Sequence, residues 1–364
     1  GPMFVPGSTG NVQDLLFVQG MTLFVQRFDV ARAALVGEPE RVADQVGSSG
    51  GSGLFSASAT GLLVFVTPPT IERQLTWIDR NGNLGDRVGP VIRVLRSIKI
   101  APDGKRAMVG MFPQERPVND DNLNVLPFDG RPVAPFATDE EVESSPMWSM
   151  DGTKVTYLRG LPGAVAQIVQ RPIDGGPFVV LASISGLTPI ADSSQDGRFC
   201  LLAKPGGGRG LYVIRTMGSK RDPEPLIEDS ANTALPKFSP DGRWIAYVSN
   251  ESSKNELYVR RFDVSPDGTP SSPQAGRKLV SNGGVRGLIR WRRDGRELTY
   301  MSADGKMMAV DVTPGPAMTI GKPHSLFTFP EAYLRANRIN AGEADMAPDG
   351  SRWLIAMPPE SARV

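Results

Sequence analysis

The chain has 364 residues with 40 glycines and 32 prolines against 7% aromatic residues, a composition typical of many turns and short strands. Forty basic residues balance 39 acidic ones, so the net charge of +1 predicts no binding to nucleic acid or to a membrane surface. One cysteine and one histidine exclude an intramolecular disulfide framework and a structural zinc site, and we expect no metal and no cofactor.

At the N-terminus, Gly1-Pro2 resembles the scar of a tag-removing protease. We expect residues 3–364 to form one domain, because one repeating unit runs through them. No apolar run approaches the roughly 20 residues of a membrane-spanning helix, so we expect no membrane segment in this sequence.

A hairpin motif recurs along the chain. Its clearest copy is Pro236–Tyr247, in which Pro240-Asp241-Gly242 joins two apolar stretches: proline fixes φ, aspartate accepts from backbone amides, and glycine adopts positive φ. The turn glycines of the copies are residues 61, 104, 152, 197, 242, 295 and 350, with successive spacings of 43, 48, 45, 45, 53 and 55 residues. A period in this range, without helical segments, predicts a propeller or an array.

After each hairpin we expect a third strand that ends near an aspartate, and then an outer fourth strand. The predicted third strands are Leu23–Asp29, Leu75–Asp79, Leu123–Asp129, Ile168–Asp174, Leu257–Asp263 and Met307–Asp311. Four antiparallel strands per unit indicate an all-β fold, a β-propeller. The sequence contains eight candidate second strands but only seven complete units, which favours eight blades with the last one incomplete. The alternative is seven blades, if the final hairpin closes onto the N-terminal strands.

Phe238–Gly242, followed by Ile245-Ala246-Tyr247 and Glu256–Val259, resembles the WD40-like propeller repeat of the Tol-Pal protein TolB and its relatives. Arg290–Tyr300 with Asp304–Val310 is similar to the C-terminal propeller region of bacterial membrane-anchored serine/threonine protein kinases, and so is Gln74–Gly82. The resemblance covers nearly the whole chain. It implies a sensor or interaction module, a fragment of a larger signalling protein, outside the cytoplasmic membrane.

The residue four places before each turn aspartate should lie on the innermost strand of its blade, next to the central channel. These residues are Lys99, Met147, Asp192, Lys237, Arg290 and Asp345. Ion pairs between blades are one interpretation, because buried charges are normally paired. A polar site for a small anion, a peptide or a metal-oxygen species is the other.

The loops that enter the innermost strands should surround one mouth of the channel. On that side we expect Arg96, Glu143, Arg286 and Glu343, together with an irregular insertion between Phe327 and Ala344. With five residues of the channel column, namely Lys99, Asp192, Lys237, Arg290 and Asp345, they make up the predicted ligand-binding set.

No candidate catalytic motif lies in the structural context that its chemistry requires. Gly47–Gly51 matches G-x-S-x-G, but it lies in a Gly/Ser-rich stretch, and the only histidine, His324, falls on a predicted outer strand. Asn119–Asn122 is more typical of a turn than of a calcium loop. There is no kinase phosphate loop or catalytic loop.

The sequence thus favours a non-catalytic, monomeric propeller that binds an unknown small ligand, a peptide or a protein at one face. A hydrolase or lyase with carboxylates and arginines in the channel is the first alternative, because acid-base catalysis does not require histidine. A TolB-like scaffold is the second. Carboxylates with perturbed pKa values in a closed pocket would favour the enzyme, whereas charges paired between blades would favour the binding module.

Overall fold

The computed structural model has two compact units, one of residues 1–70 and one of residues 71–114 and 120–364. The described residues are 2–9, 12–19, 22–44, 46–49, 52–58, 60–66, 72–92, 95–111, 122–137, 141–160, 165–185, 189–203, 210–228, 231–273, 276–336 and 344–359.

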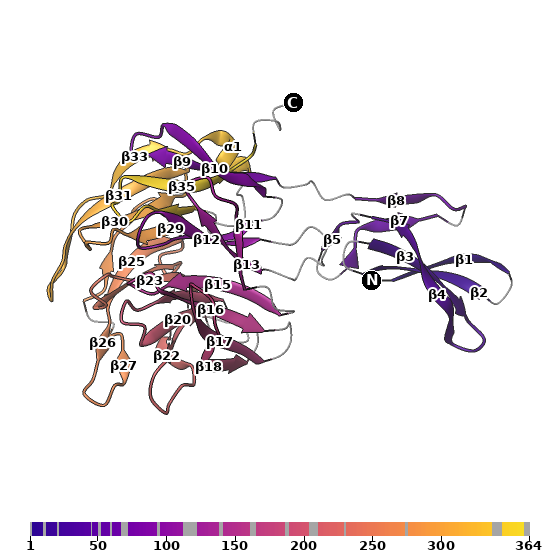
Figure 1. Ribbon diagram of the computed structural model, residues 1–364, viewed down its shortest axis with the longest axis horizontal. Helices are drawn as coiled ribbons and strands as arrows, with labels where there is room; N and C mark the ends of the chain where they lie inside the picture. Colours follow the sequence, from indigo (N-terminus) through magenta and orange to yellow (C-terminus); the bar gives the residue numbers. More distant parts are fainter. Residues whose placement is uncertain are drawn as a thin grey trace. The chain divides into compact units, whose positions relative to one another are not determined.

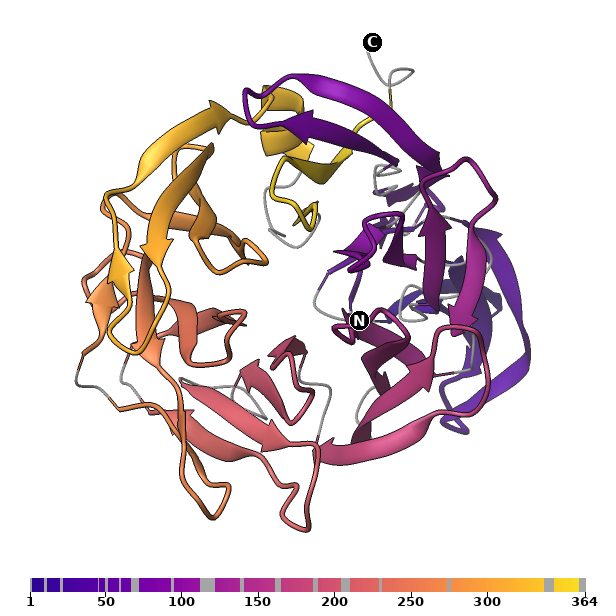
Figure 2. The same cartoon turned by 60° about the vertical axis from the view of Figure 1, so that its left-hand side comes forward.

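The described residues of the second unit form a ring of six antiparallel sheets, five with four strands and one with five (Figure 2). The chain runs outward through each of the first five, from the innermost strand to the edge (Figure 1). The first three are β11 (Leu95–Ile100), β12 (Arg106–Met111), β13 (Asn122–Pro127) and β14 (Ala134–Ala137); β15 (Val142–Trp148), β16 (Lys154–Gly160), β17 (Val165–Pro172) and β18 (Val179–Ser185); and β19 (Ile190–Ser193), β20 (Phe199–Ala203), β21 (Leu211–Arg215) and β22 (Glu224–Ile227).

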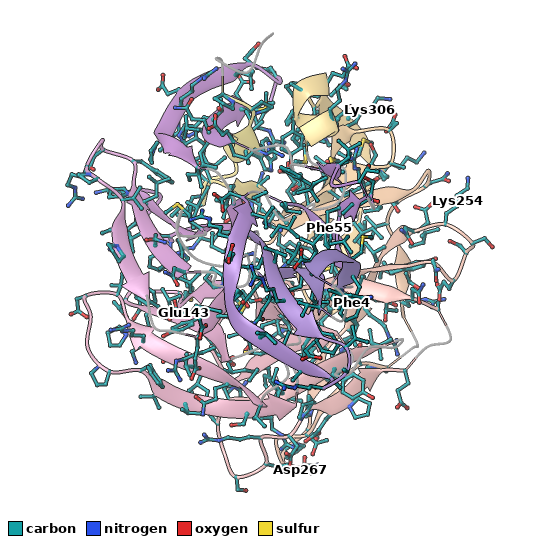
Figure 3. The ribbon with its side chains drawn as sticks, turned by 90° about the vertical axis from the view of Figure 1, so that its right-hand side faces the viewer. Phe4, Phe55, Glu143, Lys254, Asp267 and Lys306 are labelled. Atoms are coloured by element: carbon teal, nitrogen blue, oxygen red, sulfur yellow. The ribbon has the colours of Figure 1, made fainter. Side chains whose placement is uncertain are left out.

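The next two sheets carry additional strands. The fourth is β23 (Thr233–Phe238), β24 (Trp244–Ser249), β25 (Glu256–Arg261) and β28 (Lys278–Leu279), with a projecting hairpin of β26 (Asp263–Val264) and β27 (Pro270–Ser271). Asp267 lies at the tip of that hairpin (Figure 3). The fifth is β29 (Val285–Trp291), β30 (Glu297–Ser302), β31 (Lys306–Thr313) and β33 (His324–Thr328), and β32 (Thr319–Ile320) also pairs with β31.

The sixth sheet closes the ring with strands from opposite ends of the unit. Its inner strands are β34 (Ala344–Met346) and β35 (Arg352–Met357), and its outer strands are β9 (Arg73–Asp79) and β10 (Leu84–Ile92). β35 pairs with β9 over six residues, from Arg352 opposite Asp79 to Met357 opposite Gln74. Figure 2 shows the yellow C-terminal strands beside the purple β9 and β10 at the top of the ring.

The repeated turns have the conformation that their residues predict. Gly242 has φ of 68°, and its amide donates to the carbonyl of Ser239 at 2.8 Å. The Asp241 carboxylate accepts from the amide of Arg243 at 3.1 Å. Equivalent aspartate-to-amide bonds recur at Asp103, Asp151, Asp196, Asp294 and Asp349. One local motif therefore fixes the hairpin between the first and second strands of all six sheets.

The hydrophobic core lies between successive sheets. One cluster joins Leu75 and Trp77 of β9 to Ile98 of β11, and another joins Ile78 of β9 to Phe327 and Trp353. The single cysteine, Cys200, lies in this core, and its burial raises the pKa of its thiol to about 12. The faces of each sheet are thus covered by its neighbours, as in a propeller.

The all-β propeller with four-stranded antiparallel blades is confirmed, but the expected seven or eight blades are not found: the ring has six sheets. The single domain of residues 3–364 stays a prediction. The number of sheets differs at the Phe55–Phe65 hairpin, whose described strands β7 (Phe55–Ala57) and β8 (Leu63–Phe65) pair with each other and not with the ring. The β9 strand pairs instead with the C-terminal hairpin, whose Trp353 fills the core beside Ile78.

The first unit contains a four-stranded meander of β1 (Met3–Thr9), β2 (Val12–Gln19), β3 (Thr22–Asp29) and β4 (Ala34–Ala43), and a short hairpin of β5 (Ser48–Ser49) and β6 (Ser52–Gly53). Leu16, Leu23 and Val46 form its small core. Phe4 and Phe55, labelled in Figure 3, belong to this unit. No helix follows the Gly47–Gly51 motif within residues 52–58 and 60–66, so it lacks the strand-to-helix turn of a nucleophile elbow.

The described ranges contain a single short helix, α1 (Glu331–Ala336), in the predicted insertion after Phe327. Its Tyr333 is fully buried and stacks on Phe329 with ring centroids 4.7 Å apart. Among the described residues, no helix has the length and apolar character required to cross a membrane.

Candidate functional site

The innermost strands of all six sheets converge on one cavity of about 270 Å³. Its wall contains the whole predicted column, Lys99, Met147, Asp192, Lys237, Arg290 and Asp345. The residue before each turn aspartate also lines it, so the cavity opens on the side of the Asp-Gly turns: these residues are Pro102, Met150, Gln195, Pro240, Arg293 and Pro348.

Local backbone irregularities position the column. In β23 the register with β24 shifts between Ala234 and Lys237, and Leu235 within this bulge has φ of 53°. Similar shifts precede Met147 and Arg290, with Ser145 at φ 55° and Leu288 at φ 53°. A bulge bends the strand and redirects the side chain that follows it. In three of the six sheets, a left-handed residue therefore stands two positions before the side chain that lines the cavity.

Two of the column's cations are paired with carboxylates of adjacent sheets. The Lys237 ammonium lies 3.6 Å from an Asp192 oxygen and also donates to the carbonyl of Ala191. The Arg290 Nε donates to Asp345 at 2.5 Å, and its two terminal nitrogens donate to the carbonyls of Ile289 and Ala344, each at 2.8 Å. These contacts use the hydrogen-bonding groups of Arg290 for interactions between and within sheets.

The two carboxylates also bind the backbone of the following sheet. Asp192 accepts from the amide of Phe238 at 2.8 Å, and Asp345 accepts from the amide of Ile100 at 2.8 Å. Burial alone would raise the pKa of Asp345, but the Arg290 and Lys99 cations and the hydrogen bonds hold that pKa below its usual range. Asp345 therefore stays ionised and joins the last inner strand to the first.

The Lys99 side chain differs from these paired groups. It is half-buried in the cavity wall, and within the described ranges it has neither a hydrogen bond nor an ion pair. Burial, followed by the charges of Lys237 and Arg290, lowers its pKa to about 7, against the opposing effect of Asp345 and Asp192. Its amine is thus a mixture of charged and neutral forms near neutral pH.

Arg293 crosses the mouth of the cavity. Its guanidinium donates to the carbonyl of Pro102 at 2.8 Å and to that of Met150 at 3.2 Å, which belong to turns of two other sheets. The side chain is exposed, and it forms no ion pair with the carboxylates of the described part of the chain. The predicted ligand-binding set did not include Arg293, although Arg293 occupies the turn position that lines the mouth in every copy and is the only charged residue at that position.

Two tryptophans on the next position of the column also contribute to the wall. Trp148 donates from its indole nitrogen to the carbonyl of Lys99 at 2.8 Å, and Trp291 donates to that of Lys237 at 3.3 Å. Both are partly buried, both pack against core clusters, and both line the cavity. These two residues therefore belong both to the core between sheets and to the wall of the cavity.

The residues expected at a channel mouth do not join this site. Glu143 lies at the beginning of β15, about 13 Å along the strand from Met147, and is fully buried (Figure 3). Arg286 donates to the carbonyl of Leu334 at 3.3 Å and does not line the cavity. The side chain of Arg96 and all of Glu343 lie outside the described residues, as does most of Asn119–Asn122. The loops that enter the strands thus lie on the side opposite the turns that surround the cavity.

A second cavity of about 680 Å³ lies between the third and fourth sheets. Its wall includes Arg198 and Arg261, which pair with Asp196 at 2.6 Å and Asp263 at 2.7 Å. Across the ranges that the structure describes, no group of three His, Cys, Asp or Glu side chains comes together to hold a metal ion. The cavity at the channel mouth is the better candidate site, because the innermost strands of all six sheets converge on it.

Comparisons with known proteins identify the fold. No family model matches the sequence, and no curated protein matches it. A putative TolB from Agrobacterium tumefaciens has a TM-score of 0.54 at 15% identity, covering 79% of this chain and 98% of that one. TolB from Acinetobacter baumannii has a TM-score of 0.45 at 16% identity, covering 96% of this chain and 79% of that one. A periplasmic gluconolactonase from Pseudomonas aeruginosa has a TM-score of 0.44 at 17% identity, covering 87% of this chain and 97% of that one. The likeness to the Agrobacterium protein, at 15% identity, shows a TolB-like β-propeller fold.

Proposed function

We propose that the ring is a non-catalytic sensor or interaction propeller that binds a small carboxylate-bearing anion at the channel mouth. One observation carries the proposal: of the four cationic residues that line the cavity, Lys99 and Arg293 have no carboxylate partner among the described residues. Lys99 lies on an innermost strand and Arg293 at the rim, so a ligand can meet a positive charge at each end.

The charges of the cavity favour an anion. With Lys99 protonated, the innermost strands contribute three cations and two carboxylates, and Arg293 adds a fourth cation. The hydrogen bonds of Arg293 go to neutral carbonyls, and a carboxylate forms stronger, charge-assisted bonds with a guanidinium. A cavity of about 270 Å³ suits a ligand smaller than a typical drug molecule.

The same geometry supports binding over the alternative of a hydrolase or lyase. A carboxylate that acts as a general acid or base must exchange its proton near the working pH. Asp192 and Asp345 instead hold ion pairs and backbone amides between sheets, and the pKa of Asp345 is lowered by its cationic neighbours against the effect of burial. The TolB-like scaffold without a small ligand remains the competing function, and the ligand experiment separates the two.

Isothermal titration calorimetry with acetate, lactate and inorganic phosphate tests the proposal. We expect a carboxylate to bind, and Lys99→Met or Arg293→Met to weaken its binding about 10- to 100-fold, because each removes a charge-assisted contact worth about 1.5–3 kcal/mol. Lys306→Met is the control, since exposed Lys306 pairs with Asp304 outside the cavity. Absence of binding across the panel, or equal loss in the control, would count against a receptor at this site.

The resemblance to kinase propeller regions extends the proposal to the parent protein. We propose that the ring belongs to a larger signalling protein and works as a monomer outside the cytoplasmic membrane. The TolB-like fold supports this location only by likeness. An antibody against the ring should detect the native protein outside the cytoplasm of intact cells treated to open only the outer envelope; protection from the antibody until the inner membrane is lysed would contradict it.

A further inference from the structure

The Lys99 amine has the surroundings of a nucleophile. Amines become nucleophilic when burial and neighbouring cations disfavour the protonated form. Lys99 is half-buried, lies near Lys237 of β23 and Arg290 of β29, and has no hydrogen bond within the ranges that the structure describes. With a pKa of about 7, its neutral fraction at pH 7 is roughly three orders of magnitude above that of an ordinary lysine.

We propose that Lys99 forms a reversible imine with the carbonyl group of a small oxo acid bound at the channel mouth. This inference rests on the proposed function, since it specifies which carboxylate-bearing anion the receptor takes. The amine lone pair attacks the carbonyl carbon, and a proton moves from nitrogen to the alkoxide oxygen. The resulting carbinolamine then loses its hydroxyl group and the remaining proton of its nitrogen as one water molecule. The nitrogen lone pair forms the carbon–nitrogen double bond, and no oxidant or reductant takes part.

The two unpaired cations suit the two groups of an oxo acid. The carbonyl would meet Lys99 on the innermost strand, and the carboxylate would meet Arg293 at the mouth in place of the carbonyls of Pro102 and Met150. Trp148 and Met147 give the adjacent wall an apolar surface. An apolar wall limits water around the bound ligand, and exclusion of water protects an imine from hydrolysis.

The proposal predicts opposite pH trends for two measurements. The charged groups that face Lys99 are Lys237, Arg290, Asp192 and Asp345, from β23, β29, β19 and β34, while β15 contributes uncharged Met147. Burial lowers the pKa of Lys99 to about 7, so its charge changes near neutral pH. As pH rises through about 7, imine formation should increase with the neutral amine, whereas binding of a simple carboxylate should weaken as the positive charge is lost.

The test compares pyruvate with lactate, which differ in the carbonyl group. The protein is incubated with pyruvate, reduced with sodium borohydride, and mapped by peptide mass spectrometry, while lactate binding is measured by calorimetry. We expect a reduced adduct on Lys99, at least about tenfold above that on exposed Lys254 and on partly exposed Lys306 (Figure 3). Lys99→Arg should abolish it, and Lys306→Arg should leave it unchanged.

The outcomes separate the two proposals. An adduct confined to Lys99 that increases with pH supports the imine. Lactate and pyruvate binding without an adduct overturns the imine and leaves the anion receptor standing. Absence of both binding and adduct overturns the imine and counts against the receptor. Equal labelling of Lys99, Lys254 and Lys306 also overturns it, because no special reactivity would then exist.

Discussion

At the scale of single residues, Lys99 connects the stability of the ring to pH. Its pKa is about 7 in the folded state, against an ordinary value near 10.5. Between these two values the unfolded chain holds a proton that the folded chain has released. The free energy of unfolding should therefore rise as pH increases from about 7 to about 10, and Lys99 should destabilise the fold most below pH 7.

We predict that Lys99→Met increases the free energy of unfolding at pH 6 by about 1–3 kcal/mol, since methionine fills the same space without a charge to desolvate and solvent in the channel screens part of the effect. The gain should shrink as pH approaches 10. Urea denaturation across this pH range measures it, with Lys306→Met as the exposed control. A gain that is constant with pH would mean that Lys99 does not titrate near 7 in the folded protein.

At the scale of elements, the bulge in β23 holds an energetically unfavourable backbone. Leu235 adopts φ of 53° and is exposed, so its side chain contributes little burial in return for a conformation that costs an L-residue about 1–2 kcal/mol. This position is maintained because the bulge directs Lys237 toward the cavity.

Two substitutions at Leu235 should have opposite effects. Leu235→Gly should be neutral or should stabilise the protein by up to about 1 kcal/mol, whereas Leu235→Val should destabilise it by about 1 kcal/mol or more. Ala234→Gly, one position earlier and without positive φ, is the matched control and should cost about 0.5–1 kcal/mol. Differential scanning calorimetry compares them; equal losses for both glycine variants would show that Leu235 is not strained.

The elements also show what the sequence can and cannot predict. The hairpins were predictable because each carries its own Asp-Gly turn, and the inner-strand column followed from counting back from the turn aspartate. Asp79 and Arg352 lie on paired strands far apart in the sequence, and the residues around each strand do not indicate which strand it pairs with. The number of sheets in the ring therefore could not be predicted from the sequence. The contacts of Arg293 with Pro102 and Met150 join turns of three different sheets, which is why Arg293 was absent from the predicted ligand-binding set.

At the scale of the whole molecule, stability depends on the C-terminal hairpin. Trp353, Leu354 and Ile355 of β35 are fully buried, and each contributes about 1.5–3 kcal/mol by burial. Their sum approaches the entire stability of a typical domain, about 5–15 kcal/mol. We predict that a chain ending at residue 343 loses cooperative unfolding, whereas a chain ending at Pro359, which retains β34 and β35, keeps it. Cooperative melting of the shorter chain would show that five sheets are sufficient.

Because the last strands close the ring, the sixth sheet can form only after these strands have been synthesised. The β9 strand leaves the ribosome long before β35, its partner, 273 residues further along from Asp79 to Arg352. At a translation rate of about 5–20 residues per second, β9 stays unpaired with β35 for roughly 10–50 s before β35 is synthesised. Its edge and the side chains of Leu75 and Trp77 stay uncovered by β35 during that time. During translation this nascent strand is open to aggregation or to capture by a chaperone, so the yield of the protein should depend more on events at β9 than on any later sheet.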